Sequence, residues 1–400
     1  MTEYLSTGQS GESFQSPEKQ KNVPTFGVLM MGGTLAMEPN ARGVLAPAKN
    51  LSYLLSQITL PEGEFNLPAN LQSEVINIDS TNMNSRHWEM AIRAIEELQE
   101  KCDGILIPHG TDTMAYTASA IGLAMKSRLR IPIVLTGAQL PIGVEGTDAR
   151  TNLERGFKTL KKAVEDGSVE PMIFFNIEAY RGLTAFKYKE AEFDAFTTAS
   201  PTSVYRANAF GIARNAQPRT LEHVIESNKS LSEIFPGEIE TTFSNEVIGI
   251  ELKPGLTAEA VEWIAQYPGC RALLLKSFGA GNVPGSHEQE DVLYNLIPAI
   301  KKITDEMGKI IVVTSPFRGG NTVTQVYETG IQAIEAGAID AGKMTDEAAY
   351  IKTCLLLGQE HFNKENFETD QKERMDLFKK LLKHDFAGET GREFDYIPAK

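Results

Sequence analysis

The sequence predicts an α/β protein with two domains, a larger N-terminal one built on a doubly wound sheet and a smaller C-terminal α/β one. The first observation is that short apolar runs typical of buried strands alternate, from Thr25 onward, with segments whose apolar residues recur at helical spacing, which is the pattern of βαβ units. The second is size: 400 residues, of which 42% are hydrophobic, suffice for two domains of about 150 to 200 residues each.

The predicted N-terminal domain spans residues 25–205. Its clearest helix lies at 88–101, where Ala91, Ile95 and Leu98 fall on one face. Apolar runs predict strands at 26–31, 74–78, 104–108, 131–135 and 172–177, and helical periodicity predicts helices at 51–58, 88–101, 113–127 and 151–165.

A second α/β block, at 246–358, follows a stretch in which the pattern weakens. Residues 206–245 contain prolines, serines and mixed charges, and we interpret them as an interdomain connection. Residues 1–24 are polar and predict a disordered arm, and 359–400 form a charged tail with one helix at 371–383. The block itself shows strands at 247–252, 272–276 and 310–313, and helices at 257–267, 292–303, 325–336 and 346–357.

Composition narrows the class of protein. The formal net charge is −14, from 39 basic and 53 acidic residues, which argues against a nucleic-acid partner because phosphate binding needs a basic footprint. The three cysteines, Cys102, Cys270 and Cys354, are too far apart for a CxxC zinc motif, and their odd number speaks against a disulfide framework. No run approaches the roughly 18 apolar residues of a membrane span, and the N-terminus has no secretory h-region, so we expect a soluble, cytoplasmic protein.

Two Gly-Thr turns carry the clearest chemical signal. Gly32-Gly33-Thr34 follows the strand at 26–31, and His109-Gly110-Thr111-Asp112-Thr113-Met114 follows the strand at 104–108. Ligands of open α/β sheets bind at the carboxyl ends of the strands, so we expect Thr34, Thr111 and Asp112 to meet at one crevice. A hydroxyl becomes a nucleophile when a base removes its proton. Neither GxGxxG nor a P-loop motif is present.

The second turn, the segment 148–152 and Lys187 also have purely structural interpretations. Thr111 or Asp112 could cap the following helix, and we favour a hydrogen-bonded structural role for His109 over general-base catalysis. The segment 148–152 is more typical of a loop and an N-capped helix than of chemistry. Lys187, in Arg181-Gly182-Leu183-Thr184-Ala185-Phe186-Lys187, taken alone, is typical of a solvated surface charge.

Taken together, the motifs resemble the asparaginase/glutaminase family of threonine-nucleophile amidohydrolases, and most of all its cytoplasmic L-asparaginases. Residues 109–118 match the family pattern HGTDTM-x-x-TA in full, and Gly32-Gly33-Thr34 resembles its first Gly-Gly-Thr turn. The motifs at 136–138 and 181–187 follow in family order, and the resemblance covers roughly residues 25–358. It implies a flavodoxin-like larger domain.

The resemblance also implies the roles of the site residues. Thr34 matches the nucleophile, and Thr111, Asp112 and Lys187 match a second constellation in which the lysine, held by the carboxylate, helps to deprotonate threonine. Asp112 would also receive the α-ammonium group of the substrate.

The remaining predicted contacts concern the substrate and the oxyanion. Ser80 would hold the α-carboxylate, Thr81 would line the same pocket, and Ala138 could offer its backbone. Backbone N–H groups near Thr34 and Thr111 would form the oxyanion hole. The chain departs from the family at three positions: Met31 stands where a threonine is common, Val44 where a lid tyrosine is usual, and Asn82 where an aspartate is common.

The implied activity is hydrolysis of L-asparagine, with L-glutamine as a further possible substrate, to the acid and ammonia through a threonine acyl-enzyme, without metal or organic cofactor, by a homodimer or homotetramer. One alternative is an amidase subunit that supplies ammonia to a tRNA-dependent amidotransferase. Such subunits carry an additional N-terminal domain, for which the 24-residue arm is too short. Another is a non-catalytic amino-acid sensor that uses the same pocket. A third alternative, a nucleotide-binding module, is supported by fold analogy alone.

Overall fold

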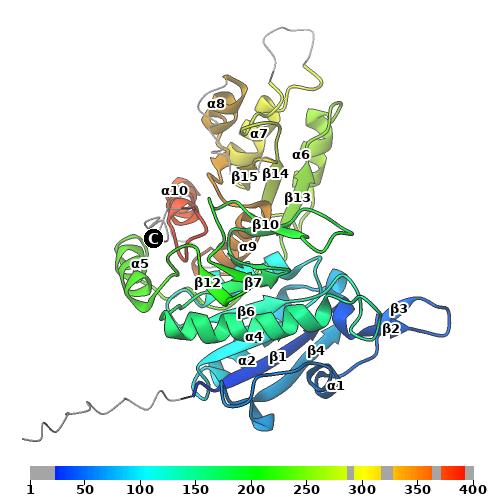
Figure 1. Ribbon diagram of the computed structural model, residues 1–400. Coiled ribbons are helices and arrows are strands. Elements are labelled where there is room, and N and C mark those ends of the chain that lie inside the picture. Colours follow the sequence, from blue (N-terminus) through cyan, green and yellow to red (C-terminus); the bar gives the residue numbers. More distant parts are fainter. Residues whose placement is uncertain (1–22, 286–291, 317–327, 363–370, 392–400) are drawn as a thin grey trace, which may run out of the picture.

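The computed structural model describes residues 23–285, 292–316, 328–362 and 371–391. Two α/β bodies lie one above the other, with the larger sheet in the lower body of Figure 1 and the smaller in the upper. Nearly all of the predicted arm at 1–24, the last residues of the tail and part of the predicted helix at 325–336 lie outside the described residues. Within the described ranges, no helix is long and apolar enough to cross a membrane.

The larger domain is built on an eight-stranded sheet in the order β12-β11-β8-β7-β6-β5-β1-β4. Strands β4, β1, β5, β6 and β7 are parallel, and β8, β11 and β12 continue the sheet antiparallel. The strands are β1 (Phe26–Gly32), β4 (Gln72–Ile78), β5 (Gly104–Pro108), β6 (Ile133–Thr136), β7 (Pro171–Phe175), β8 (Glu178–Arg181), β11 (Tyr205–Asn208) and β12 (Gly211–Arg214). The parallel order 2-1-3-4-5 reverses direction between β1 and β5, so the two Gly-Thr turns leave the sheet at its topological switch point.

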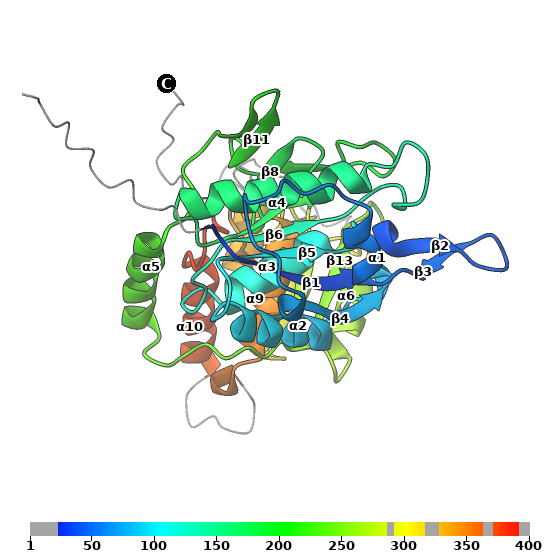
Figure 2. The same ribbon diagram turned by 60° about the horizontal axis from the view of Figure 1, so that its bottom comes forward.

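Helices cover both faces of this sheet, as the doubly wound prediction requires. Side chains of β1 alternate: Leu29 and Met31 pack with helices α2 (Ser85–Leu98) and α3 (Met114–Ala124). Val28 and Met30 point to the opposite face, which is covered by α1 (Leu51–Ser56) and α4 (Ala149–Glu165). Figure 2 shows α4 on one side of the sheet and α2 on the other.

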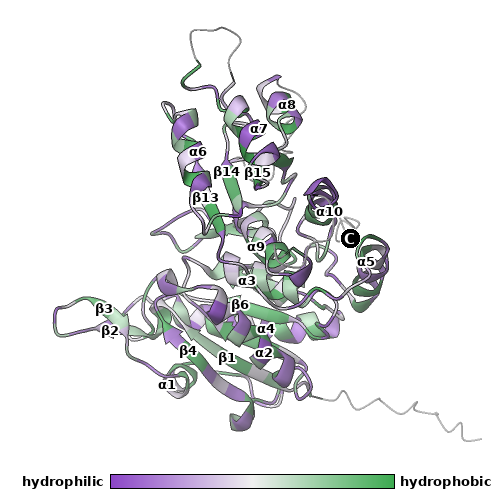
Figure 3. Ribbon diagram, turned by 180° about the vertical axis from the view of Figure 1, so that it is seen from behind, coloured by the Kyte–Doolittle hydropathy of each residue, from purple (hydrophilic) through white to green (hydrophobic). Residues whose placement is uncertain are grey.

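The smaller domain has a four-stranded parallel sheet in the order β13-β14-β15-β16. Its elements are β13 (Val247–Glu251), β14 (Ala272–Lys276), β15 (Ile310–Thr314) and β16 (Ile339–Asp340), with helices α6 (Ala258–Gln266), α7 (Ile297–Asp305), α8 (Glu328–Glu335) and α9 (Asp346–Leu357). Helices α6, α7 and α8 pack on one face, while α9 packs on the other and also contacts α3 of the larger domain. Figure 3 shows hydrophobic strands inside and hydrophilic surfaces on outer helices such as α10 (Gln371–Lys383).

The structure confirms the fold class and differs from the prediction in several elements. The antiparallel strands β8, β11 and β12 were not predicted, and the segment 206–245 contains β12 and helix α5 (Leu221–Ile234). The helix predicted to begin at residue 292 begins at Ile297, because Pro298 occupies its first turn. Four further short strands pair as hairpins: β2 (Met37–Pro39) with β3 (Leu45–Pro47), and β9 (Ala185–Lys187) with β10 (Phe196–Thr198).

Candidate active site

The Gly32-Gly33 turn brings Thr34 against the ends of the two strands that flank β1. Gly33 has φ 99° and ψ 175°, a conformation essentially confined to glycine. A Cβ atom at Gly33 would overlap the backbone of Gly110, and one at Gly32 would overlap the backbone of Ile78. The Gly33 N–H donates to the Ile78 carbonyl at 3.1 Å. The two glycines therefore allow the close approach that joins the first turn to the second.

Ser80 completes this contact from the end of β4. Ser80 is buried, and a Cβ atom at Gly110 would overlap its side chain. The Thr113 hydroxyl donates to the Ser80 carbonyl at 2.9 Å. Three adjacent strand ends thus carry Thr34, Ser80 and Thr111 into one region, as the sequence predicted for the two threonines.

His109 is fixed within the second turn by a defined chain of hydrogen bonds. Its Nδ1 lies 2.7 Å from the Gly110 carbonyl, which can only accept, so Nδ1 carries the proton. Nε2 then accepts from the Thr117 hydroxyl at 2.9 Å, and that hydroxyl accepts from Trp88 Nε1 at 3.2 Å. Complete burial lowers the pKa of His109 to about 4, against the opposing effect of the Gly110 carbonyl. His109 is therefore the hydrogen-bonded structural residue that the sequence favoured.

Lys187 lies beside both Thr111 and Asp112. Its Nζ donates to Thr111 Oγ1 at 3.0 Å and to Asp112 Oδ1 at 2.7 Å. The Lys187 side chain is only 13% exposed, so it is not a solvated surface charge. A second carboxylate, Glu190, lies 3.0 Å from the same Nζ. Nothing in the sequence pointed to Glu190, since it belongs to none of the motifs.

The helix-capping alternative for this turn is not what the structure shows. Helix α3 begins after Thr113, and no side chain caps it. The Thr111 hydroxyl is engaged by Lys187 instead. Within the described part of the chain, the structure gives the Thr34 hydroxyl no hydrogen-bond partner, and Thr34 is half-buried at the start of a short 3₁₀ turn.

The two other predicted contacts differ in accessibility. Thr81 is exposed, and its hydroxyl donates to Asp79 Oδ1 at 3.0 Å. Ala138 is buried just beyond the end of β6. The neighbouring Gly137 packs closely against the His109 carbonyl, so Ala138 follows directly on a residue that touches the second turn.

The segment 148–152 supports the turn after β6. The Asp148 carboxylate accepts from the Gln139 N–H at 3.0 Å and from the Leu140 N–H at 3.0 Å rather than capping α4. Asn152 Nδ2 donates to the Gly137 carbonyl at 3.0 Å. The structural interpretation of this segment is thus right, although no side chain caps α4, because the Asp148 oxygens are used by the loop.

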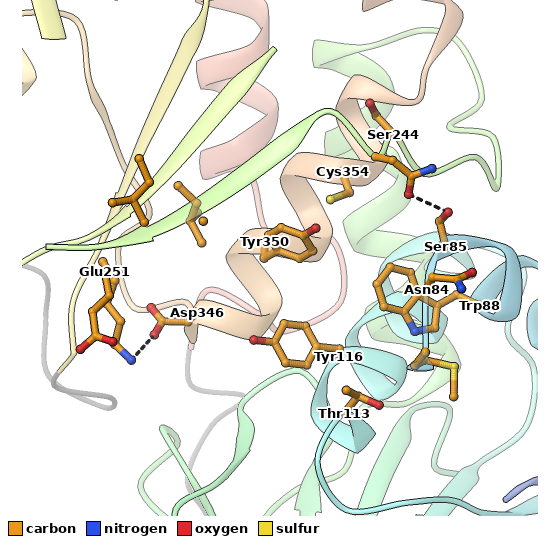
Figure 4. A pocket seen from close by; sticks show the side chains of 16 residues that line it. Asn84, Ser85, Trp88, Thr113, Tyr116, Ser244, Glu251, Asp346, Tyr350 and Cys354 are labelled. Carbon is orange, nitrogen blue, oxygen red and sulfur yellow. Dashed lines mark hydrogen bonds and ion pairs between the residues drawn. The ribbon is translucent and has the colours of Figure 1, made fainter. Parts of the chain in front are cut away.

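A cavity of about 530 Å³ lies next to this cluster, between the two domains. Figure 4 shows Thr113 and Tyr116 of the larger domain facing Tyr350 and Asp346 of α9. Its lining residues are Met83, Asn84, Ser85, Trp88, Thr113, Tyr116, Ser244, Asn245, Gly249, Ile250, Glu251, Leu274, Lys276, Asp346, Tyr350 and Cys354.

The three cysteines of the chain are all buried. The cavity's one thiol, Cys354, is inert because burial raises its pKa to about 12. Cys102 and Cys270 are likewise free and buried. Among the residues that the structure describes, no group of three or more His, Cys, Asp or Glu side chains could hold a metal ion.

Comparison with known proteins matches two family models to the two domains. The first, "Asparaginase, N-terminal", matches residues 26–218, and the second, "Glutaminase/Asparaginase C-terminal domain", matches residues 246–369. The chain is 30% identical over 384 residues to a Glutamyl-tRNA(Gln) amidotransferase subunit of Pyrococcus furiosus, covering 93% of this chain and 78% of that protein. It is 29% identical over 339 residues to L-asparaginase 1 of Escherichia coli strain K12, covering 83% and 91%. The solved structure of the thermostable L-asparaginase from Thermococcus kodakarensis superimposes with a TM-score of 0.73 at 27% identity, covering 91% and 98%.

Proposed function

The chain belongs to the asparaginase/glutaminase family, and we propose that it hydrolyses L-asparagine to L-aspartate and ammonia through a threonine acyl-enzyme. The observation that carries the proposal is the contact of Lys187 Nζ with both Thr111 Oγ1 and Asp112 Oδ1, at 3.0 and 2.7 Å. The buried Thr111 hydroxyl lies beside an amine that a carboxylate orients. This arrangement would supply the base and the orienter of a covalent hydrolase, and the Thr34 hydroxyl would be its nucleophile.

In the proposed reaction the Thr34 hydroxyl attacks the side-chain amide carbon of the substrate. A C–O bond forms, the C–N bond breaks, and the hydroxyl proton reaches the departing nitrogen through Thr111 and Lys187, so that ammonia leaves. Water then attacks the ester, which releases aspartate and restores Thr34.

Substrate binding follows from the charges at the same strand ends. Asp112 would accept the α-ammonium group, because its carboxylate is 45% exposed and carries the opposite charge. Ser80 and Thr81 would bind the α-carboxylate, and the backbone of Ala138 would contact the amide. No step in this scheme calls for a metal or organic cofactor.

The second candidate function is that of an ammonia-supplying subunit of a tRNA-dependent amidotransferase. It is favoured by the similarity to the Pyrococcus furiosus subunit, which covers 93% of this chain. The net charge of −14 disfavours tRNA as a direct ligand of this chain. We also propose a cytoplasmic homodimer or homotetramer, which light scattering of the purified protein would check.

The test is ammonia release from L-asparagine and L-glutamine by the purified full chain. We expect Thr34→Ala and Thr111→Val each to lower kcat by at least about 10³-fold, since each removes a member of one catalytic unit. Thr136→Val is the matched control: its hydroxyl also lies at the end of a strand of this sheet but donates to the Phe174 carbonyl at 2.8 Å. Wild-type activity in Thr34→Ala would refute the assignment of the nucleophile.

The same assay separates the candidate functions. Turnover by the chain alone supports the asparaginase. Turnover that appears only with a co-purified subunit supports the amidotransferase role. Binding of aspartate without any turnover, seen as a raised melting temperature, supports a sensor.

A further inference from the structure

Lys187 has a second carboxylate partner that none of the motifs supplies. Glu190 Oε2 lies 3.0 Å from Lys187 Nζ, in addition to the 2.7 Å contact with Asp112. Glu190 is 87% exposed, whereas the lysine is 13% exposed. The ammonium group therefore contacts one carboxylate from the turn before α3 and another at the surface.

The loop that carries Glu190 is tied to the end of another strand of the sheet. Gln139, just after β6, donates through Nε2 to the Glu190 carbonyl at 2.7 Å and to the Glu192 carbonyl at 2.9 Å. The Gln139 backbone is in turn held by Asp148. The position of Glu190 relative to Lys187 is thus set by hydrogen bonds to the main chain of its loop.

The other charged groups of this loop pair with one another. Asp194 accepts from Lys189 Nζ at 2.6 Å and from the Tyr188 hydroxyl at 3.2 Å. Glu192 lies 3.7 Å from Lys189. The charged side chains that face Lys187 from the described elements around it are therefore Asp112 and Glu190.

These contacts define what Glu190 does in the proposed reaction. Asp112 is expected to take up the α-ammonium of the substrate, which leaves it a weaker partner for Lys187 once substrate is bound. We propose that Glu190 is a positioning residue that keeps Lys187 Nζ within reach of Thr111 when the substrate ammonium competes for Asp112. This inference rests on the proposed amide hydrolysis.

The test compares Glu190→Gln and the conservative Glu190→Asp with Glu192→Gln in measurements of kcat and KM. We expect Glu190→Gln to lower kcat by roughly 2- to 5-fold, the range for so exposed an ion pair, with KM little changed, and Glu190→Asp to recover part of the loss. Because salt screens exposed pairs, about 1 M NaCl should bring the wild-type kcat toward that of Glu190→Gln. Glu192→Gln has the same chemistry two residues away, and its kcat should match that of wild type.

An unchanged kcat in Glu190→Gln, or an equal loss in Glu192→Gln or at both salt concentrations, would overturn the proposal, because a merely structural loop residue predicts no salt-dependent loss. If the wild type hydrolyses no amide, the proposed function fails, and the ion pair is tested by labelling. The rate at which acetic anhydride modifies Lys187 at one fixed pH, followed by mass spectrometry of its peptide, reports how firmly the amine is held. Labelling must be faster in Glu190→Gln than in wild type and Glu192→Gln, and identical rates would refute the role of Glu190.

Discussion

Replacing Gly33 by alanine tests whether the close approach of two turns builds the site. The added Cβ atom would lie 2.6 Å from the His109 carbonyl carbon and closer still to Gly110. The glycine-only backbone conformation costs about 1 to 3 kcal/mol for alanine, and overpacking adds about 1 to 3 kcal/mol. We therefore expect Gly33→Ala to lose about 3 kcal/mol or more of unfolding free energy.

The effect on turnover should be larger than this stability loss implies. Relieving the overlap requires Thr34 and Thr111 to separate by about 1 Å, and a misplacement of that size costs about 10²-fold in rate. The measurements are kcat/KM for asparagine and urea unfolding of the same preparations. Gly63→Ala is the control, because Gly63 also has positive φ, at +73°, but open space around its Cβ position. Turnover of Gly33→Ala within about threefold of wild type, or a loss matched by Gly63→Ala, would refute the reasoning.

Three further predictions concern stability and are checked by urea unfolding. The pKa of His109 is about 4 in the folded protein, against 6.5 for an unperturbed histidine, so the unfolded chain binds the extra proton as the pH falls from 6.5 to about 4. Wild type should therefore lose about 3 kcal/mol more than His109→Gln between about pH 7 and pH 4, and parallel curves would contradict this. Lys352→Met leaves Glu389 buried without its ion-pair partner and should cost about 3 to 5 kcal/mol, whereas Lys301→Met, at an exposed pair, should cost under about 0.5 kcal/mol. Phe157→Ala removes a ring stacked 5.4 Å from a neighbouring ring and should cost about 3 to 5 kcal/mol; a loss under about 1 kcal/mol would show that the surrounding core collapses into the space.

The sequence predicted the parallel half of the large sheet well, because buried parallel strands are continuous apolar runs that local periodicity reveals. The antiparallel strands β8, β11 and β12 were missed because each has only four residues, too few for alternation to show. The charged composition of residues 359–400 also concealed a buried ion pair. Lys352 and Glu389 are both fully buried, and composition cannot show that two opposite charges will meet in a core.

The site residues likewise fall into those that the sequence could predict and those that it could not. Thr34, Thr111 and Asp112 follow two strands whose ends are neighbours, so the sheet topology alone brings them together. Lys187 is 75 residues from Asp112 in the chain, and only the family motif pointed to it. Glu190 could not be predicted, because its contact depends on how Gln139 holds the loop.

Helix α9 has a consequence for how the whole chain unfolds. It belongs to the smaller domain by sequence, yet nearly all of its residues are buried, between the small sheet and α3. Cutting the chain at the boundary between the two matched family domains would expose most of this helix to water. The apolar cluster it joins is continuous across that boundary, so the two domains should melt in a single cooperative transition, and neither half should be stable when expressed alone.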